Sequence, residues 1–197
     1  MLKIKQNIFE IAETKLAEQG LTKQALRSIE VALSLPAHYC DLIFPRGIDE
    51  LIKSYNDWHD TKIISNLKII SNESIRAKIS RALIAKTTSQ NQLFVFNSLK
   101  YYKTPTNIPF AGKIGWQTAC AIWQWAGDSS LDHNFYSKRL IFEVLYYKAL
   151  NFYCSDTSVD HIQTENYIES LVNDFVNSIT KLKQFSLSKL PIFRYFL

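Results

Sequence analysis

Apolar residues recur at spacings of three and four along most of the chain, which is the periodicity of α-helices. Only five Gly and five Pro interrupt the 197 residues, so a β fold with many turns is disfavoured. The pattern predicts an all-α fold, with helices over residues 2–19, 22–34, 36–43, 48–65, from 71–74 to 87, 90–102, 110–126, 131–154 and 157–183.

Local signals set several of these boundaries. Gly20 ends the first helix, Thr22 caps the second, and Pro36 suits the first turn of the third. Residues 104–109 are expected to form a connection, because two prolines cannot lie inside a helix. Two seams of residues three and four apart are expected to be buried, namely Ile75, Ile79, Ala82 and Leu83, and then Ile168, Leu171, Phe175, Ile179 and Leu182. The second seam can face the protein itself or a symmetric copy.

The first helices have the layout of a helix-turn-helix, in which a very short helix follows a turn. This spacing resembles the N-terminal DNA-binding domain of TetR-type repressors. The segment that would read DNA, 36–44, holds no Lys or Arg and carries Asp41. DNA affinity comes largely from Lys and Arg, so DNA binding is disfavoured, and a TetR-type transcription regulator is the alternative hypothesis. We expect a helix-turn-helix-like head at 1–47, a larger helical body at 48–184 and a tail at 185–197.

Composition adds few constraints. The formal net charge of +5 and the hydrophobic fraction of 47% suit a folded protein that binds nucleic acid, an anionic membrane, or neither. The three Cys are odd in number and far apart, and so predict no disulfide framework. No apolar run reaches the roughly 20 residues of a membrane span, and the first ten residues show no presequence, so a cytoplasmic location is expected.

Common catalytic motifs are missing from the sequence. It has no P-loop, GxGxxG, HExxH or Glu-x-x-His, and we therefore expect no cofactor, metal ion or di-iron centre. His59 and His161 are expected on solvated helix faces. His133, beside Asp132, is a candidate acid–base group, but nothing resembling a nucleophile–base pair accompanies it. We expect no catalytic residue.

Residues 123–139 form the most informative stretch, a helix end followed by a new helix. Gly127 suits a left-handed cap for the first helix. Asp128, Ser129 and Ser130 are all good N-cap residues for the second. An aromatic-rich corner of this kind is more often packing than recognition, and on the pattern alone we favour packing.

The helix after this corner carries an unusual mixture of charged and aromatic residues in its first two turns. Asp132, Tyr136 and Arg139 fall on one face, at spacings of four and three. Phe135 lies four residues before Arg139, where a cation can stack on a ring. This is the composition of a contact patch.

The predicted body holds more large apolar residues than one small core requires. Simple packing and a cavity for a hydrophobic ligand explain them equally well. The residues that would line such a cavity are Phe110, Trp116, Trp123, Phe142 and Tyr146.

The last thirteen residues combine apolar and basic side chains without an acid. Such a segment suits the interface of a bilayer, which we favour, although docking onto its own domain is the alternative. The residues expected to contact a membrane are Leu187, Leu190, Ile192, Phe193, Arg194 and Phe196.

Together these residues are similar to the ninth coenzyme Q biosynthesis accessory protein family, in its bacterial form. The matching residues of the corner are Trp123, Ala126, Gly127, Asp128, Ser130, Asp132, Asn134, Tyr136, Lys138 and Arg139. The runs Phe-Pro-Arg-Gly at 44–47 and Asn-Ile-Pro at 107–109 also fit, and the resemblance extends over about residues 8–185.

The resemblance implies a TetR-like fold whose head is not used on DNA and whose body holds an isoprenoid quinone precursor or a phospholipid. It implies a protein that is no enzyme itself and presents demethoxyubiquinone to a di-iron hydroxylase. The patch for that partner would be Asp132, Phe135, Tyr136 and Arg139, although the family often has Trp at position 135. A homodimer, peripheral on the inner face of the bacterial cytoplasmic membrane, is also expected. The tail is shorter than the family's membrane helix and contains Pro191.

Overall fold

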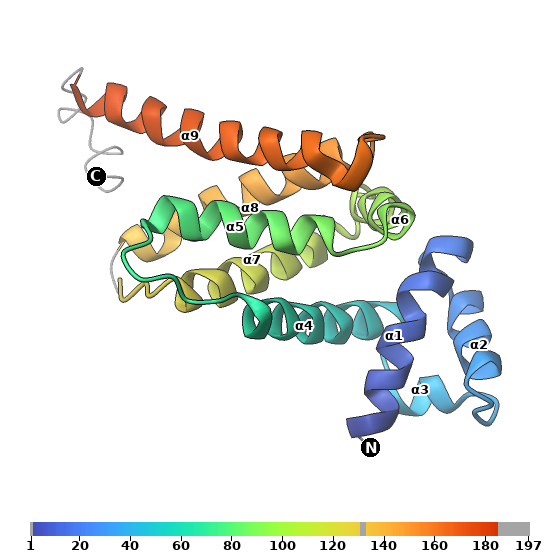
Figure 1. Cartoon of the computed structure of the whole chain (residues 1–197). Helices are drawn as coiled ribbons and strands as arrows, with labels where there is room; N and C mark the ends of the chain where they lie inside the picture. Colours follow the sequence, from blue (N-terminus) through green and yellow to red (C-terminus); the bar gives the residue numbers. More distant parts are fainter. Residues whose placement is uncertain (1, 131–132, 185–197) are drawn as a thin grey trace.

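The computed structural model describes residues 2–130 and 133–184, and within these residues all regular structure is helical (Figure 1). The helices are α1 (Leu2–Gln19), α2 (Lys23–Ala32), α3 (Tyr39–Ile43), α4 (Ile48–Asn66), α5 (Ile75–Thr88), α6 (Gln92–Tyr102), α7 (Ile108–Trp125), α8 (His133–Tyr153), the short 3-10 helix η1 (Val159–His161) and α9 (Ile162–Gln184). The predicted all-α class is confirmed for this part of the chain, and the TetR-like arrangement stays a prediction.

Several predicted helix starts differ from the observed ones, and the largest shift is in the last helix, which begins at Ile162 rather than at 157. The connection expected over 104–109 ends at Asn107, because α7 already begins at Ile108 with Pro109 in its first turn. Proline is tolerated there, since the backbone N–H that it lacks would have no partner inside the helix. The third helix begins at Tyr39 rather than at 36, because His38 adopts a left-handed backbone with φ of 65°. Pro36 therefore lies in the turn before α3.

Other local signals act as expected. Thr22 accepts a hydrogen bond from the Ala25 backbone N–H at 3.3 Å, which caps α2, and Ser74 caps α5 through Ala77 at 3.2 Å. Gly20 ends α1 with a left-handed φ of 70°. These caps satisfy backbone groups that the helix ends would otherwise leave without partners.

Two hydrophobic clusters organise the molecule, and α4 reaches from one to the other (Figure 1). The head cluster unites α1–α3 with Leu51, Ile52 and Tyr55 of α4 and with Phe94 of α6. The body cluster is built by α5–α9. The head cluster thus extends past residue 47, and the proposed division at 47 and 184 stays a prediction. The predicted tail, 185–197, lies outside the described residues.

Polar contacts fix the head against the body. The Asn97 side chain of α6 donates to the backbone carbonyls of Leu16 and Ala17, at 3.1 and 2.8 Å, and so satisfies the C-terminal end of α1. The Tyr55 hydroxyl donates to Glu13 of α1 at 2.8 Å. These bonds restrict rotation of α1 about the long helix α4.

Some predicted seams differ from the observed ones. Ile79, Ala82 and Leu83 are buried as expected, but Ile75, in the first turn of α5, is half exposed. On α9, Ile168 is buried and Leu171 and Phe175 pack on the body cluster. The side chains of Ile179 and Leu182 lie outside the described part of the chain.

A buried polar cluster joins α4, α5 and α7. The Lys86 side chain is 0% exposed, and its ammonium group lies 2.6 Å from Asp60 Oδ1. It also lies 3.0 Å from Asn56 Oδ1 and 3.0 Å from His59 Nδ1. Thr118 of α7 completes the cluster by donating to Asp60 Oδ2 at 2.8 Å. Lys86 thus donates two hydrogen bonds, and the Asp60 carboxylate supplies the counter-charge that a buried ammonium requires.

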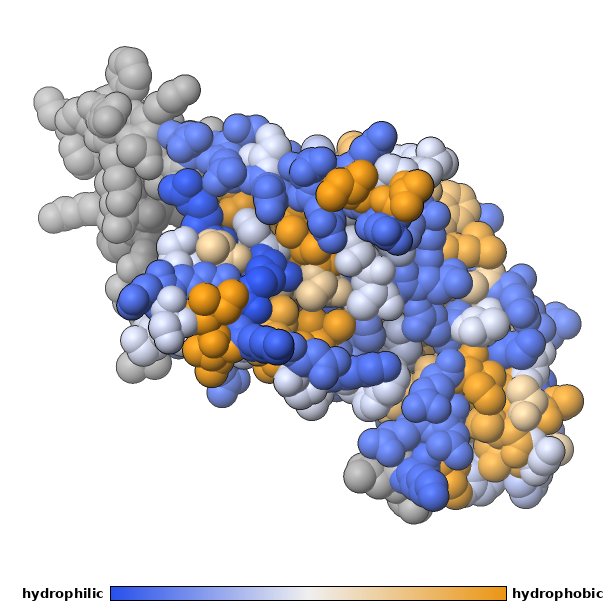
Figure 2. Space-filling view, viewed as in Figure 1, coloured by the Kyte–Doolittle hydropathy of each residue, from blue (hydrophilic) through white to orange (hydrophobic). Residues whose placement is uncertain are grey.

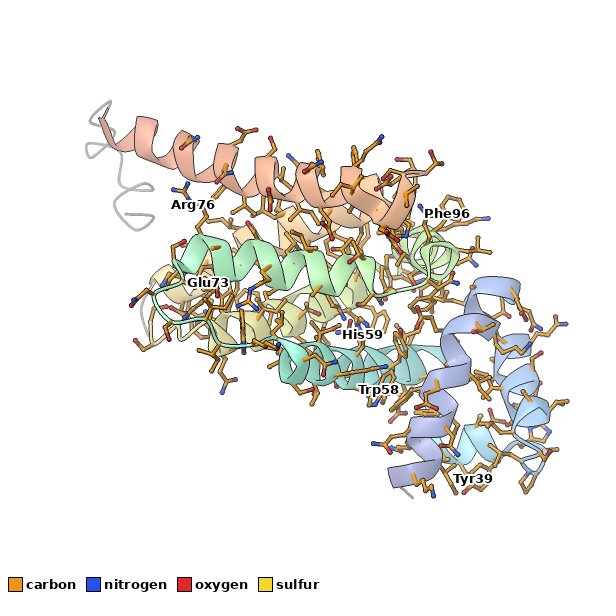
Figure 3. All side chains as sticks on the ribbon, viewed as in Figure 1. Tyr39, Trp58, His59, Glu73, Arg76 and Phe96 are labelled. Carbon is orange, nitrogen blue, oxygen red and sulfur yellow. The ribbon has the colours of Figure 1, made fainter. Side chains whose placement is uncertain are left out.

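His59 is part of this cluster, so its prediction on a solvated face was wrong. Figure 3 shows His59 on the α5 side of α4, with Trp58 on the side facing α1. Because an ammonium group can only donate, Nδ1 of His59 must accept from Lys86, and Nε2 donates to Ser89 Oγ at 3.1 Å. Burial and then the neighbouring Lys86 and Lys62 lower the pKa of His59 to about 2.

Replacing Lys86 by Met is expected to lower the free energy of unfolding by about 3–5 kcal/mol, because it leaves the Asp60 carboxylate buried without its cation. The matched control is Lys53→Met, which removes a partly exposed pair to Asp57 at 2.7 Å. It should change the same quantity by less than about 1 kcal/mol. Urea titration measures both, and equal losses would contradict this role for Lys86.

Acid is expected to destabilise the fold partly through His59. The unfolded imidazole takes up a proton near its ordinary pKa of 6.5, while the folded one stays neutral down to about pH 2. The contribution of His59 is therefore complete above about pH 6.5 and falls by up to about 1.4 kcal/mol per pH unit as the pH drops further. In His59→Gln this part of the slope should vanish. Urea titrations between neutral pH and about pH 5 would refute the idea if both proteins gave the same slope.

Candidate functional site

The corner between α7 and α8 has a tightly determined backbone. Gly127 adopts a left-handed φ of 92°, as predicted from its position. Its N–H donates to the Gln124 carbonyl at 3.1 Å, and the Asp128 N–H donates to the Trp123 carbonyl at 2.9 Å. This is the Schellman pattern of hydrogen bonds, which ends a helix and turns the chain sharply.

The described part of α8 begins at His133, and capping of this helix by Asp128, Ser129 or Ser130 stays a prediction. The Asp128 side chain is 3% exposed and binds two cations. Lys138 Nζ lies 2.7 Å from Oδ1, and Arg139 Nη1 lies 3.0 Å from Oδ2. Burial alone would raise the pKa of Asp128, but hydrogen bonds from Lys138, Ser130 and Arg139 hold it well below its ordinary value. The ionised carboxylate therefore ties the corner to the first turns of α8.

Arg139 lies beneath the surface rather than on it. Its side chain is buried, and Nη1 also donates to the Phe135 backbone carbonyl at 2.9 Å. The guanidinium lies 3.4 Å from the centre of the Phe135 ring, which confirms the predicted stacking of cation on ring. Arg139 thus fixes both the backbone and the ring of Phe135.

Three aromatic rings meet above this arginine. The Trp116 ring of α7 stacks on Tyr136, with centroids 6.0 Å apart, and meets Phe135 edge-on at 6.3 Å. Phe135 and Tyr136 are 5.2 Å apart and nearly perpendicular. Trp116 and Phe135 are half-buried, whereas Tyr136 is 59% exposed. The rings that support Tyr136 leave its outer face open to solvent.

Exposed apolar residues continue from Tyr136 along α8. Leu140 and Val144 follow at intervals of four residues, and both are more than half exposed. We call Trp116, Phe135, Tyr136, Leu140 and Val144 the α8 strip. Sequence reasoning missed Leu140 and Val144 and placed Trp116 in a lipid cavity. The available signal was that α8 is apolar on more than one face, since Phe142, Leu145 and Tyr146 already fill the buried side.

Close packing of α7 on α8 supports the strip. A Cβ atom at Gly115 would lie 2.8 Å from Cγ of Glu143, so only glycine allows this approach. Burial between the helices raises the pKa of the Glu143 carboxyl. The Tyr147 hydroxyl donates to the Ala111 carbonyl at 2.6 Å and adds a polar tie between the same helices.

The five residues predicted to line a lipid cavity do not meet in one place. Phe110 packs on the head cluster, Trp116 belongs to the strip, and Trp123 donates from Nε1 to the Lys138 carbonyl at 3.1 Å. Phe142 and Tyr146 are buried in the body cluster. A cavity of about 30 Å³ between head and body is lined by Tyr146 alone among these five. That volume holds about one water molecule.

Several predicted residues lie outside the part of the chain that the structure describes. Asp132 and the six tail residues Leu187, Leu190, Ile192, Phe193, Arg194 and Phe196 lie outside the described residues, as does the side chain of His133. Among the described helices, none is long and apolar enough to cross a bilayer. Within the same residues, no three His, Cys, Asp or Glu side chains are grouped so that they could hold a metal ion.

A family model described as COQ9 matches residues 108–178, which include α7, α8 and most of α9. The corner and every residue of the α8 strip fall inside this match. Over residues 108–178 the chain is therefore similar to the COQ9 family. The predicted resemblance is therefore confirmed, while the bacterial form stays a prediction.

Two COQ9 relatives align with parts of the chain. A Dictyostelium discoideum protein named "Probable ubiquinone biosynthesis protein coq9, mitochondrial" is 41% identical over 58 residues, which cover 29% of this chain and 19% of that protein. The human "Ubiquinone biosynthesis protein COQ9, mitochondrial" is 30% identical over 87 residues, which cover 44% of this chain and 27% of that protein. The chain thus matches about a fifth to about a quarter of the length of these relatives.

Asp128→Asn is expected to lower the free energy of unfolding by about 3 kcal/mol, because the neutral amide leaves the Arg139 guanidinium buried without a counter-charge. Glu18→Gln is the control, since it removes an exposed pair with Lys15 at 2.8 Å. That change should amount to less than about 1 kcal/mol. Thermal and urea unfolding test both variants. A loss at Asp128 no greater than at Glu18 would show that the corner between α7 and α8 does not depend on this carboxylate.

Proposed function

We propose that the protein is a lipid-binding accessory protein of ubiquinone biosynthesis that presents demethoxyubiquinone to a di-iron hydroxylase at a membrane. The observation that carries the proposal is the α8 strip, an exposed apolar surface inside the segment that matches COQ9. In this proposal the protein does no chemistry itself. Its contribution is to bring an almost insoluble substrate and its enzyme together.

The strip has the properties of a protein-docking surface. Aromatic residues are enriched among the side chains that dominate binding energy, especially where their surroundings hold them rigid. Tyr136 is held in this way by Trp116 and Phe135. Its exposed ring can therefore be buried by a partner without a large loss of side-chain freedom.

The predicted partner residues take different roles in this proposal. Tyr136 and the exposed edge of Phe135 would touch the hydroxylase. Arg139 would act as a positioning residue, because its guanidinium is already used by Asp128 and Phe135. Asp132 remains a proposed contact residue outside the described part of the chain.

The lipid part of the proposal needs a movement of the body. Phe110, Trp116, Trp123, Phe142 and Tyr146 stay our candidates for contact with the precursor. The cavity of about 30 Å³ is too small for a quinone ring, let alone its prenyl chain. We propose that helices of the body separate when the lipid enters, and that a phospholipid can occupy the same space.

The remaining expectations belong to the same proposal. We expect a TetR-like fold, a homodimer through α8 and α9, and a peripheral position on the inner face of a bacterial cytoplasmic membrane. The two relatives carry "mitochondrial" in their names. A pathway that acts on a membrane-dissolved quinone places the accessory protein at a bilayer in either setting.

A DNA-binding regulator is the less favoured function. Arg27 is the basic residue of α2 nearest to α3, and it is paired with Glu30 at 2.7 Å and also with Asp41. The side chain of Leu42 on α3 is 79% exposed. An apolar residue and an occupied arginine offer little to a phosphate backbone. We therefore expect no nucleic-acid partner.

Tyr136→Ala is expected to weaken binding of the hydroxylase by about thirtyfold, as truncation of a central aromatic anchor does. The control is Phe96→Ala on α6, whose ring is 52% exposed and lies away from α8 (Figure 3). It should alter the Kd by less than about twofold. Co-purification gives the affinity, and mass spectrometry of cell extracts should show demethoxyubiquinone accumulating only with Tyr136→Ala.

Two results would contradict the proposal in different ways. Equal hydroxylase binding by both variants would show that docking does not use the strip. Failure of the wild-type protein to bind the hydroxylase or to alter the quinone pool would exclude the accessory function itself.

A further inference from the structure

The loop between α4 and α5, residues 67–74, carries exposed apolar side chains. Ile69 is 83% exposed and Ile70 is 51% exposed. Ile75, in the first turn of α5, is half exposed beside them. These three isoleucines lie within seven residues that are otherwise polar. We call them the apolar tip, and the rest of the body does not cover them.

The tip has a defined structure. The Glu73 N–H donates to the Ile70 carbonyl at 3.3 Å, and Asn72 closes the turn with a φ of 63°. Arg81 braces the loop from α5, since it donates to both Glu73 carboxylate oxygens at 2.9 and 2.6 Å and to the Lys68 carbonyl at 2.8 Å. These hydrogen bonds fix the turn, and the isoleucine side chains are exposed to solvent.

The segment that carries the tip is basic. Residues 61–81 hold five Lys or Arg and one acid, which accounts for four of the five net positive charges of the chain. That acid, Glu73, is neutralised by Arg81, which keeps the pKa of the carboxyl below its ordinary value. Lys68 and Arg76 flank the tip and are exposed. Figure 3 shows Glu73 and Arg76 at this end of α5.

The loop lies next to the corner that begins the α8 strip. The Arg81 guanidinium lies 5.3 Å from the Trp125 ring centre at the end of α7, and Lys78 Nζ lies 3.5 Å from the Ala126 carbonyl. Figure 1 places loop and corner at the end of the molecule opposite to α1–α3. Figure 2 shows apolar atoms at that end, over the loop, bordered by hydrophilic surface.

We infer that the α4–α5 loop is a membrane contact of its own, in which Ile69 and Ile70 enter the interface of an anionic phospholipid bilayer while Lys68 and Arg76 meet the phosphates. Apolar residues flanked by cations bind such surfaces through buried area and charge together. The inference rests on the membrane setting of the proposed function but not on hydroxylase docking. The contact would hold the corner and the α8 strip close to the bilayer in which the quinone precursor dissolves.

Charge favours lipid over other occupants of the tip. The tail of this chain, 185–197, contains Lys189 and Arg194 and no acid. It would bring like charges onto Lys68 and Arg76, whereas an anionic bilayer would attract both segments. A second copy of the chain would likewise oppose two positive loops if it paired symmetrically here.

The test measures vesicle flotation of the full-length protein, without hydroxylase or quinone. The variant Ile69→Ser with Ile70→Ser is expected to bind vesicles of phosphatidylcholine and phosphatidylglycerol about tenfold more weakly than the wild type. The matched control is Val31→Ser with Leu42→Ser, two head residues that are each 79% exposed. It should bind within about twofold of the wild type. Lys68→Gln should bind the anionic vesicles about fivefold more weakly and leave binding to pure phosphatidylcholine unchanged.

Each alternative gives a different contrary result. Unchanged flotation of the isoleucine variant would overturn the inference. A loss of unfolding free energy in that variant, with flotation intact, would show that the tail covers the tip. A change from dimer to monomer in light scattering, again with flotation intact, would assign the tip to a second copy. None of these results bears on binding of the hydroxylase through Tyr136, which is measured without vesicles.

Discussion

The buried pair of Lys86 and Asp60 is the constraint on which the helical body depends. A charge this deep is tolerated only when every partner is in place, so the helices that supply the partners cannot shift independently. Asp60 comes from α4, Lys86 from α5 and Thr118 from α7. Thr118 fixes the register of α7, and Trp116 lies two residues before it. The position of the aromatic cluster at the α8 strip therefore follows from a polar contact made on the opposite side of α7.

A second buried carboxylate, that of Asp128, holds the corner between α7 and α8 in a similar way. Asp128 follows the Gly127 turn and binds Lys138 and Arg139 one helix later. Ionisation of Asp128 is favoured by these cations, and the cations are held in turn by the carboxylate. Arg139 then fixes Phe135, which supports Tyr136. The exposed tyrosine is thus the last member of a chain of contacts that begins with a backbone turn.

Sequence reasoning was accurate where the decisive contact is local. Gly127, Thr22 and the stacking of Arg139 on Phe135 depend on residues no more than four apart, and the structure confirms all three. Sequence reasoning failed where the partner of a residue comes from a helix distant in the sequence. Asp128 has the chemistry of a cap, and only the return of α8 shows that its partners are cations. Periodicity likewise marks the apolar side of α4 but cannot show that the polar His59 will meet a buried lysine from α5.

The positions of the buried charged pairs indicate which helices would separate to admit a lipid. Separation of α4, α5 and α7 would leave Lys86 or Asp60 without its partner. An unpaired charge in an apolar surrounding has a high free energy, so this separation is disfavoured. The inner side of α8, with Phe142, Tyr146 and Ala149, is instead held mainly by apolar packing and by neutral hydrogen bonds such as Tyr147 to Ala111. Apolar surface exposed there by an opening would be covered again by the lipid that enters, so the net free-energy change can be small. Movement of α8 against α7 would also shift Phe135, Tyr136, Leu140 and Val144 of the α8 strip, because they belong to the same helix as the inner surface. Lipid entry and presentation of Tyr136 to a partner would then be coupled through α8 itself.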